Sequence, residues 1–278
     1  MFNLSYNGLS SLRGFTPDRY INAGIMFPLA NVFSCLMTGH ASAIAIALVN
    51  MTIACVLVAA KVGILSFSFG KSLHFLNQLD PLRVTAICTA IIAAIFLLGS
   101  GGTSLVIIQG VSFLAFSVGN HIQSSPMLLK LKPTSAIEKA LLHPALWYGV
   151  GYTFIGLTIA GGEALLDNWV AALFTIAGIV EIIASLVMSA GKVVNKAGPF
   201  IGVTIGTLFL FAAGIATNNW AGAACALSAG IGELDLAIQT QQAQNKVAKK
   251  TGVPVSLGVL TKPLQGLMDS VGIPKYGR

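Results

Sequence analysis

Residues 42–61 read SAIAIALVNMTIACVLVAAK, and this stretch decides the fold because its first charged residue is the lysine at its end. In an α-helix, which rises about 1.5 Å per residue, twenty residues reach about 30 Å, the thickness of the hydrocarbon core of a bilayer. Further apolar stretches of similar length lie on both sides of it. Together they predict eight membrane-spanning helices, at residues 17–38, 42–61, 81–98, 103–121, 144–160, 168–189, 199–217 and 220–240.

The composition of the whole chain agrees with this reading. Of its 278 residues, 55% are hydrophobic and 9% are charged, and the mean hydropathy is +0.82. An ordinary soluble domain is about a quarter charged. The composition therefore excludes a soluble enzyme, a disordered chain and a disulfide-stapled secreted domain. We expect one transmembrane domain over residues 17–240, preceded by a short interfacial segment, 1–16, and followed by a cytoplasmic tail, 241–278.

The connections between the predicted helices alternate in length. Very short turns at residues 38–40, 99–102, 161–167 and 217–219 follow each odd-numbered helix, whereas the other connections are longer and more polar. The predicted fold is therefore all-α, with four helical hairpins in series at residues 17–61, 81–121, 144–189 and 199–240.

Basic residues predict the orientation of these hairpins. All 16 Lys and Arg fall outside the short turns, on one side of the predicted map. Lys and Arg are enriched on the cytoplasmic side of membrane proteins, so both termini are expected to be cytoplasmic, in a plasma membrane or a bacterial inner membrane. This sorting also explains the net charge of +7 without nucleic-acid binding. The first helix is interpreted as a retained anchor; if it were cleaved as a signal peptide, seven spans would remain, with the N-terminus outside.

A repeated pattern accompanies the hairpins. Each one begins near a proline, at residues 17, 81, 144 and 199, and proline suits the first turn of a helix. The second helices of the last two hairpins both open with Asn-Trp. Each reaches an Ala-Gly-Ile-x-Glu segment, at residues 177–181 and 229–233. Because all hairpins enter from the same side, the sequence predicts parallel repeats with Glu181 and Glu233 at one depth.

Carboxylates inside these apolar helices are the leading candidates for a functional site. A carboxylate in hydrocarbon costs at least about 2.5–3.5 kcal/mol on insertion scales and persists where it faces a partner, a cavity or a pathway. Glu181 and Glu233 could bind a cation, hold a proton or accept hydrogen bonds from a polar solute; alternatively, both could reach water near the cytoplasmic interface. Asp235 is interpreted as part of the polar exit of the last helix.

Amide side chains supply two weaker candidates. Asn50 and Gln109 lie near the middle of the second and fourth predicted helices, where they could line a path or simply hydrogen-bond between helices. Pro28 predicts a kink or a local opening in the first helix. The four histidines and four cysteines lack ligand spacing, so we expect no metal site, no cofactor and no disulfide.

Three functions are compatible with these features. The preferred hypothesis is a carrier or channel for a small polar or cationic solute, with Glu181, Glu233, Asn50 and Gln109 as candidate binding residues. The alternative is a non-catalytic membrane scaffold or a subunit of a larger complex, with a membrane-protein partner or a second copy of the chain. An enzyme acting on lipid is not expected, because the sequence offers no nucleophile–base pair, metal cluster or nucleotide-binding motif.

Overall fold

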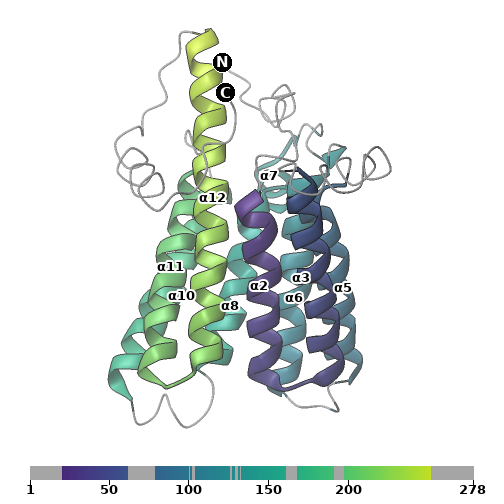
Figure 1. Ribbon diagram of the computed structural model, residues 1–278. Helices are drawn as coiled ribbons and strands as arrows, with labels where there is room; N and C mark the ends of the chain where they lie inside the picture. The colour runs from purple at the N-terminus through teal and green to yellow at the C-terminus, as the bar shows by residue number, and fades with distance from the viewer. Residues whose placement is uncertain are drawn as a thin grey trace.

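Long helices make up most of the described part of the computed structural model (Figure 1), which covers residues 21–61, 79–99, 101, 104–125, 127–128, 131, 133–160, 168–190 and 197–251. Within these ranges the structure contains no strand. The helices are α2 (Ile21–Thr38), α3 (Ala41–Lys61), α5 (Pro81–Gly99), α6 (Ser104–Ser124), α7 (Ala136–Leu141), α8 (Pro144–Ala160), α10 (Trp169–Ala190), α11 (Gly198–Ala216) and α12 (Trp220–Thr251).

Each of the eight ranges predicted from the sequence overlaps one long helix, and residues 17–20 and 103 of these ranges lie outside the described residues. Six of these helices, α3, α5, α6, α10, α11 and α12, are long and apolar enough to cross a membrane, and the described part of α2 forms a shorter apolar helix. The chain is therefore an all-α, multi-pass integral membrane protein, and a lipid bilayer surrounds its apolar helices. The predicted segment 1–16, residues 252–278 of the predicted tail and the turn at 161–167 lie outside the described residues.

The last helix corrects one predicted boundary. The sequence places its end at residue 240, but α12 continues to Thr251. The added residues, QQAQNKVAKKT at 241–251, are rich in Gln, Ala and Lys, which favour helix, and the stretch contains no Gly or Pro. Polarity ends a membrane span without ending a helix. Figure 1 shows α12 extending past the ends of the other long helices.

Side-chain caps and left-handed turn residues set the helix ends. The side chain of Asp80 accepts a hydrogen bond from the amide of Leu82, at the start of α5. Asn168 and Asn219 cap α10 and α12 in the same way, as their positions before tryptophan predicted. The short α11–α12 turn contains Asn218 at a φ of 57°, a conformation that Asn tolerates better than most residues.

The long helices form a closed ring. Each one packs against the next along the chain, and α12 packs against α2. The first four helices, α2, α3, α5 and α6, also share a contact between α2 and α5. The last four, α8, α10, α11 and α12, repeat this pattern with a contact between α8 and α11. The two sets meet where α6 packs on α8 and where α12 packs on α2.

The two places where these sets meet use the same kind of hydrogen bond. The hydroxyl of Ser112, in α6, donates to the carbonyl oxygen of Gly151, in α8, over 2.9 Å. The hydroxyl of Ser228, in α12, donates to the carbonyl oxygen of Met26, in α2, also over 2.9 Å. Helices α2, α6, α8 and α12 therefore surround the centre of the bundle.

Candidate functional site

Glu233 is the carboxylate that the fold places deepest in the bundle. It lies on α12, close to the middle of the helix, and its side chain is 0% exposed. Neither of its carboxyl oxygens has a hydrogen-bonding partner among the described residues. The described basic side chains Arg83 and Lys139 are both exposed, so neither neutralises it. A buried carboxyl without a partner is costly to keep, which marks this position as a functional candidate.

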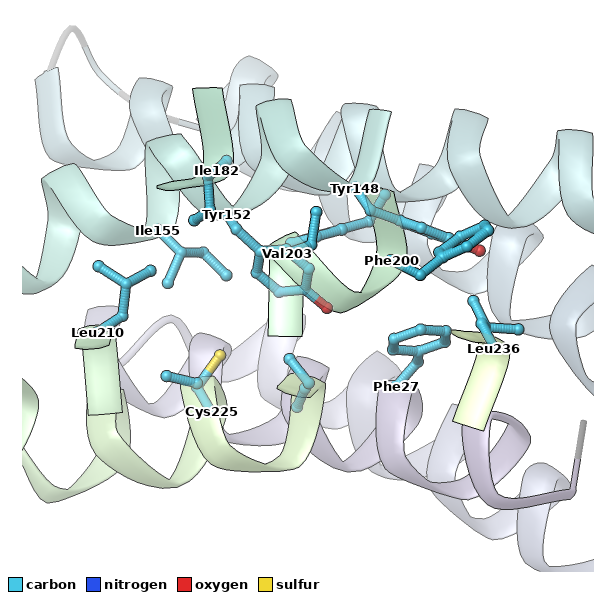
Figure 2. Packing of buried hydrophobic residues seen from close by; sticks show 14 of the residues in the cluster. Phe27, Tyr148, Tyr152, Ile155, Ile182, Phe200, Val203, Leu210, Cys225 and Leu236 are labelled. Atoms are coloured by element: carbon cyan, nitrogen blue, oxygen red, sulfur yellow. The ribbon is translucent and has the colours of Figure 1, made fainter. Parts of the chain in front are cut away.

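Tyr152 of α8 lies between the Glu233 carboxyl and a cavity at the centre of the bundle. The tyrosine side chain is 1% exposed and lies close enough to the Glu233 carboxyl to interact with it electrostatically. Its ring also forms part of the cavity wall. Figure 2 shows Tyr152 projecting from α8 towards the helices that carry Cys225 and Phe27. One side chain thus touches both the cavity and the buried acid.

The cavity lies between α2, α6, α8 and α12 and is narrow. It leaves room for about one water molecule. Aromatic rings, amides and small side chains from these four helices line it: Phe27, Ala30, Asn31, Ser34, Phe116, Asn120, Tyr148, Tyr152, Ile155 and Cys225. Charged side chains are missing from this lining, and the carboxyl of Glu233 lies next to one lining residue, Tyr152.

Two pairs of aromatic rings define the shape of the cavity. The ring of Phe27, in α2, lies 5.3 Å from that of Tyr148, in α8, centroid to centroid. The rings of Phe116, in α6, and Tyr152, in α8, are 4.7 Å apart. Both distances suit favourable aromatic contacts. The two tyrosines are four residues apart, so they lie on one face of α8.

The glycines near these rings explain how they fit between the helices. A side chain at Gly151 would overlap the ring of Phe116, and one at Gly232 would overlap the ring of Phe27. Gly232 directly precedes Glu233. The absence of a side chain there lets α2 approach α12 beside the buried acid.

Gln109 ties three helices together beside the cavity. Its amide nitrogen donates to the hydroxyl of Ser34, in α2, and its amide oxygen accepts from the hydroxyl of Thr158, in α8, over 3.1 Å. The amide is completely buried in α6 and both of its polar groups have partners. In this structure Gln109 therefore acts as an interhelical connector next to the site.

Asn50, the other amide candidate, lies away from the cavity, on α3. It is completely buried, and neither its amide oxygen nor its amide nitrogen has a hydrogen-bonding partner among the described residues. Helix α3 packs on α2 and α5. The side-chain amide of Asn31, on α2, donates a hydrogen bond to the hydroxyl of Thr89, on α5, over 3.4 Å. Helices α2 and α3 therefore each bury an amide side chain, in addition to Gln109 on α6.

Glu181 occupies a different environment from Glu233. It is partly exposed on α10, close to Gly202 of α11. Helices α10 and α12 both pack on α11 but barely touch each other. The structure therefore does not bring the two carboxyls together.

The two Ala-Gly-Ile-x-Glu segments nevertheless lie at the same depth along α11. Gly178, in the first segment, packs on Gly206 of α11, and Gly230, in the second, packs on the next residue, Thr207. The two glutamates follow these glycines by three residues each. The two glutamates therefore lie at the same depth, but Glu233 is buried and Glu181 is partly exposed.

Asp235 has a role that sequence reasoning missed. The sequence suggested that it belongs to the polar exit of the last helix, yet it is only 1% exposed. Its carboxylate accepts a hydrogen bond from the backbone amide of Ala23 over 3.1 Å and a longer one, 3.5 Å, from Gln239. Ala23 lies in the first turn of α2, so Asp235 caps that helix from α12.

The aromatic lining was also missed, and part of it was visible in the sequence. Tyr148 and Tyr152 are the two tyrosines of a largely apolar helix and lie one turn apart. The hydroxyl of Tyr148 donates to the amide oxygen of Asn120 over 3.0 Å. No local pattern links Phe27 and Phe116 to these tyrosines, because they come from two other helices.

Metal binding and disulfide formation find no support among the described residues. No three His, Cys, Asp or Glu side chains are grouped there in a way that could hold a metal ion. Cys35, Cys88 and Cys225 are buried, Cys55 is exposed, and none of the four is disulfide-bonded.

Comparisons with known proteins found no match: no family model, no curated protein and no solved structure is similar to this chain. The class of protein, a multi-pass membrane protein, therefore rests on the fold itself.

Proposed function

We propose that this chain is a carrier or channel for a small polar or cationic solute, in which Glu233 is the binding or coupling group. The observation that carries the proposal is the completely buried Glu233 carboxyl, without a hydrogen-bonding partner among the described residues, next to a cavity at the centre of the bundle. A purely structural carboxyl would be expected to have partners, as Asp235 does.

In this proposal all eight long helices cross the membrane and both termini are cytoplasmic. The positions of the 16 Lys and Arg support this orientation. Helix α8, with 17 residues, and the apolar part of α2, Asn22–Thr38, are shorter than the other six helices, but both are apolar.

The ring is proposed to consist of two repeats of four helices, each made of two of the predicted hairpins. The shared pattern of helix contacts supports this, as do the matching hydrogen bonds of Ser112 and Ser228 where the repeats meet. Both repeats run in the same direction, so the axis that relates them lies along the membrane normal, through the cavity. A relative movement of the two repeats would open the cavity, which lies between them.

Transport by proteoliposomes tests the role of Glu233. The purified chain would be reconstituted, and the currents or fluxes that follow concentration jumps of H⁺, Na⁺, K⁺ and choline would be recorded. We expect at least one of these cations to give a saturable signal that Glu233→Gln abolishes, because the substitution removes the negative charge and keeps the side-chain shape.

Two carboxylate variants are matched controls. Asp235→Asn changes a buried acid two residues away on the same helix, and Glu181→Gln changes the acid of the other Ala-Gly-Ile-x-Glu segment. Both should keep the signal. A flux that persists in Glu233→Gln would contradict the assignment of Glu233. Stoichiometric co-purification of another protein in mild detergent, with no flux, would instead favour the scaffold.

A further inference from the structure

We propose that the central cavity is a binding site for a small organic ammonium cation. This inference rests on the proposed function and specifies its substrate class. The aromatic rings of α2, α6 and α8 contact the alkyl groups of the cation, and the carboxylate of Glu233 supplies the compensating charge from behind Tyr152.

The aromatic lining is the first step of the argument. Four of the ten lining residues are aromatic, and they come from three different helices, so the rings surround the space. A cation over the face of an aromatic ring is attracted by the ring quadrupole, and the attraction grows when the cation is desolvated. Groups of rings of this kind are the usual protein solution for alkylammonium ions.

The sign of the charge is the second step. The lining contains no charged side chain, and the buried acid nearest to it is Glu233, which interacts with Tyr152. The described Lys and Arg side chains are exposed. An anion in the cavity would therefore lack a partner and face a carboxylate, whereas a cation would give that carboxylate the partner that the described side chains do not provide.

The hydrogen-bonding groups of the lining provide the third step. The hydroxyl of Tyr148 is used by Asn120, the hydroxyl of Ser34 by Gln109, and the amide nitrogen of Asn31 by Thr89. These groups are engaged within the protein. A polyol or a sugar needs many directional hydrogen bonds, but an alkylammonium ion needs few, so the lining suits the ion better.

The cavity is smaller than the proposed cation. It leaves room for about one water molecule, so the cation requires the cavity to widen. The lining comes from α2 and α6 of the first repeat and from α8 and α12 of the second. A small separation of the two repeats would therefore widen the cavity from both sides.

A pair of probes of equal shape tests the charge requirement without any variant. Choline and 3,3-dimethyl-1-butanol differ in that a carbon replaces the charged nitrogen. Binding of each to the full-length purified chain in detergent would be measured by calorimetry and by thermal shift. We expect choline to bind at least about tenfold more tightly than the neutral alcohol. Equal binding of the two, or no binding of choline, would overturn the proposed ligand class.

Variants then test the two recognition elements separately. Tyr152→Leu removes a ring, and Glu233→Gln removes the charge; each should weaken choline binding by at least about tenfold. Asp235→Asn keeps the rings of the lining and Glu233, so it should bind choline like the wild type. Unchanged affinity in both Tyr152→Leu and Glu233→Gln would place choline elsewhere and contradict the inference.

The flux experiment separates this inference from the proposed function. A flux of H⁺, Na⁺ or K⁺ that depends on Glu233, in a chain that does not bind choline, would keep the carrier and overturn the ammonium site. The absence of any flux that depends on Glu233, choline included, would overturn both.

Discussion

The two four-helix sets that we propose to be repeats make matching helix contacts but bury different polar groups. Helices α2, α3, α5 and α6 contain no carboxylate at all, and their buried polar groups are amides and hydroxyls. The second repeat buries two carboxyls, those of Glu233 and Asp235, on its last helix. The two sets of helices therefore make matching contacts, but the buried carboxyls lie in the second set alone. Two sets of helices with matching contacts can therefore differ in the charged groups that they bury.

The outer helices of the two repeats differ as well. In the second repeat, α10 and α11 approach closely through Gly178 and Gly206, and the peptide oxygen of each would lie only 2.9 Å from a Cβ atom at the other. In the first repeat, α3 contains no glycine and α5 has one at its end. Small residues allow membrane helices to pack closely, which makes the second repeat the more tightly built of the two.

Filling the glycine contact should have the largest effect on stability. Gly206→Leu places a side chain against the backbone of Gly178 and the side chain of Ile182. We expect it to lower the free energy of unfolding by about 3 kcal/mol, the upper end of the usual range for overpacking. Denaturant-induced unfolding of the purified chain in detergent would measure the change.

Gly198→Ala on the same helix is the matched control, because nothing lies within 4 Å of an added Cβ there. It should leave the stability unchanged or raise it slightly. If both variants unfolded alike, the close α10–α11 contact would not distinguish the repeats.

The hydrogen bonds between the repeats should have smaller and equal effects. Ser112→Ala and Ser228→Ala each remove one interhelical bond, for which the average measured in membrane proteins is about 0.6 kcal/mol. We expect losses of this size in the free energy of unfolding, and additive losses in the double variant, because the bonds join different helix pairs. A loss in one variant alone would break the equivalence of the two repeat boundaries.

The connection between the repeats should give the smallest effect, and a pH-dependent one. Helix α7 begins with a capping box in which Glu138 accepts hydrogen bonds from the amide and hydroxyl of Thr134 and the amide of Ser135. The bond from the Thr134 amide, followed by the other two, lowers the pKa of the Glu138 carboxyl from its ordinary value of 4.5.

Since the pKa is lower in the folded chain, the cap is fully present above the ordinary value and is lost as the pH falls through the folded value. Amide hydrogen exchange in α7, expressed as protection relative to the unprotected rate, should therefore decrease at acidic pH. Glu138→Gln should remove this dependence. Exchange in α5 and α6 should not respond, and a response there would mean that the connection is coupled to the first repeat.

The sequence predicted the helices well because their signals are local. Apolar length, asparagine caps and short turns each act within a few residues, as Asn168 and Asn219 show. The end of α12 was missed because change of polarity and change of secondary structure need not coincide, and residues 241–251 favour helix although they are polar.

The site could be predicted only in part, because membrane helices are apolar on all sides and their sequences do not reveal which face points inward. Glu181 and Glu233 occur in the same local pattern, yet one is partly exposed and the other is completely buried. Their difference comes from the order of the helices around the ring. The cavity residues come from four helices, and no local pattern records that juxtaposition.

The cap that Asp235 provides has a consequence for the biogenesis of the protein. The acid and the amide of Ala23 that it caps are 212 residues apart, and the bond between Ser228 and Met26 spans 202. While the ribosome synthesises the first seven long helices, the beginning of α2 lacks this cap and the ring stays open. The ring of helices therefore closes only after α12 has been synthesised. A chain truncated before α12 would leave the ring open and expose it to the quality-control machinery of its membrane.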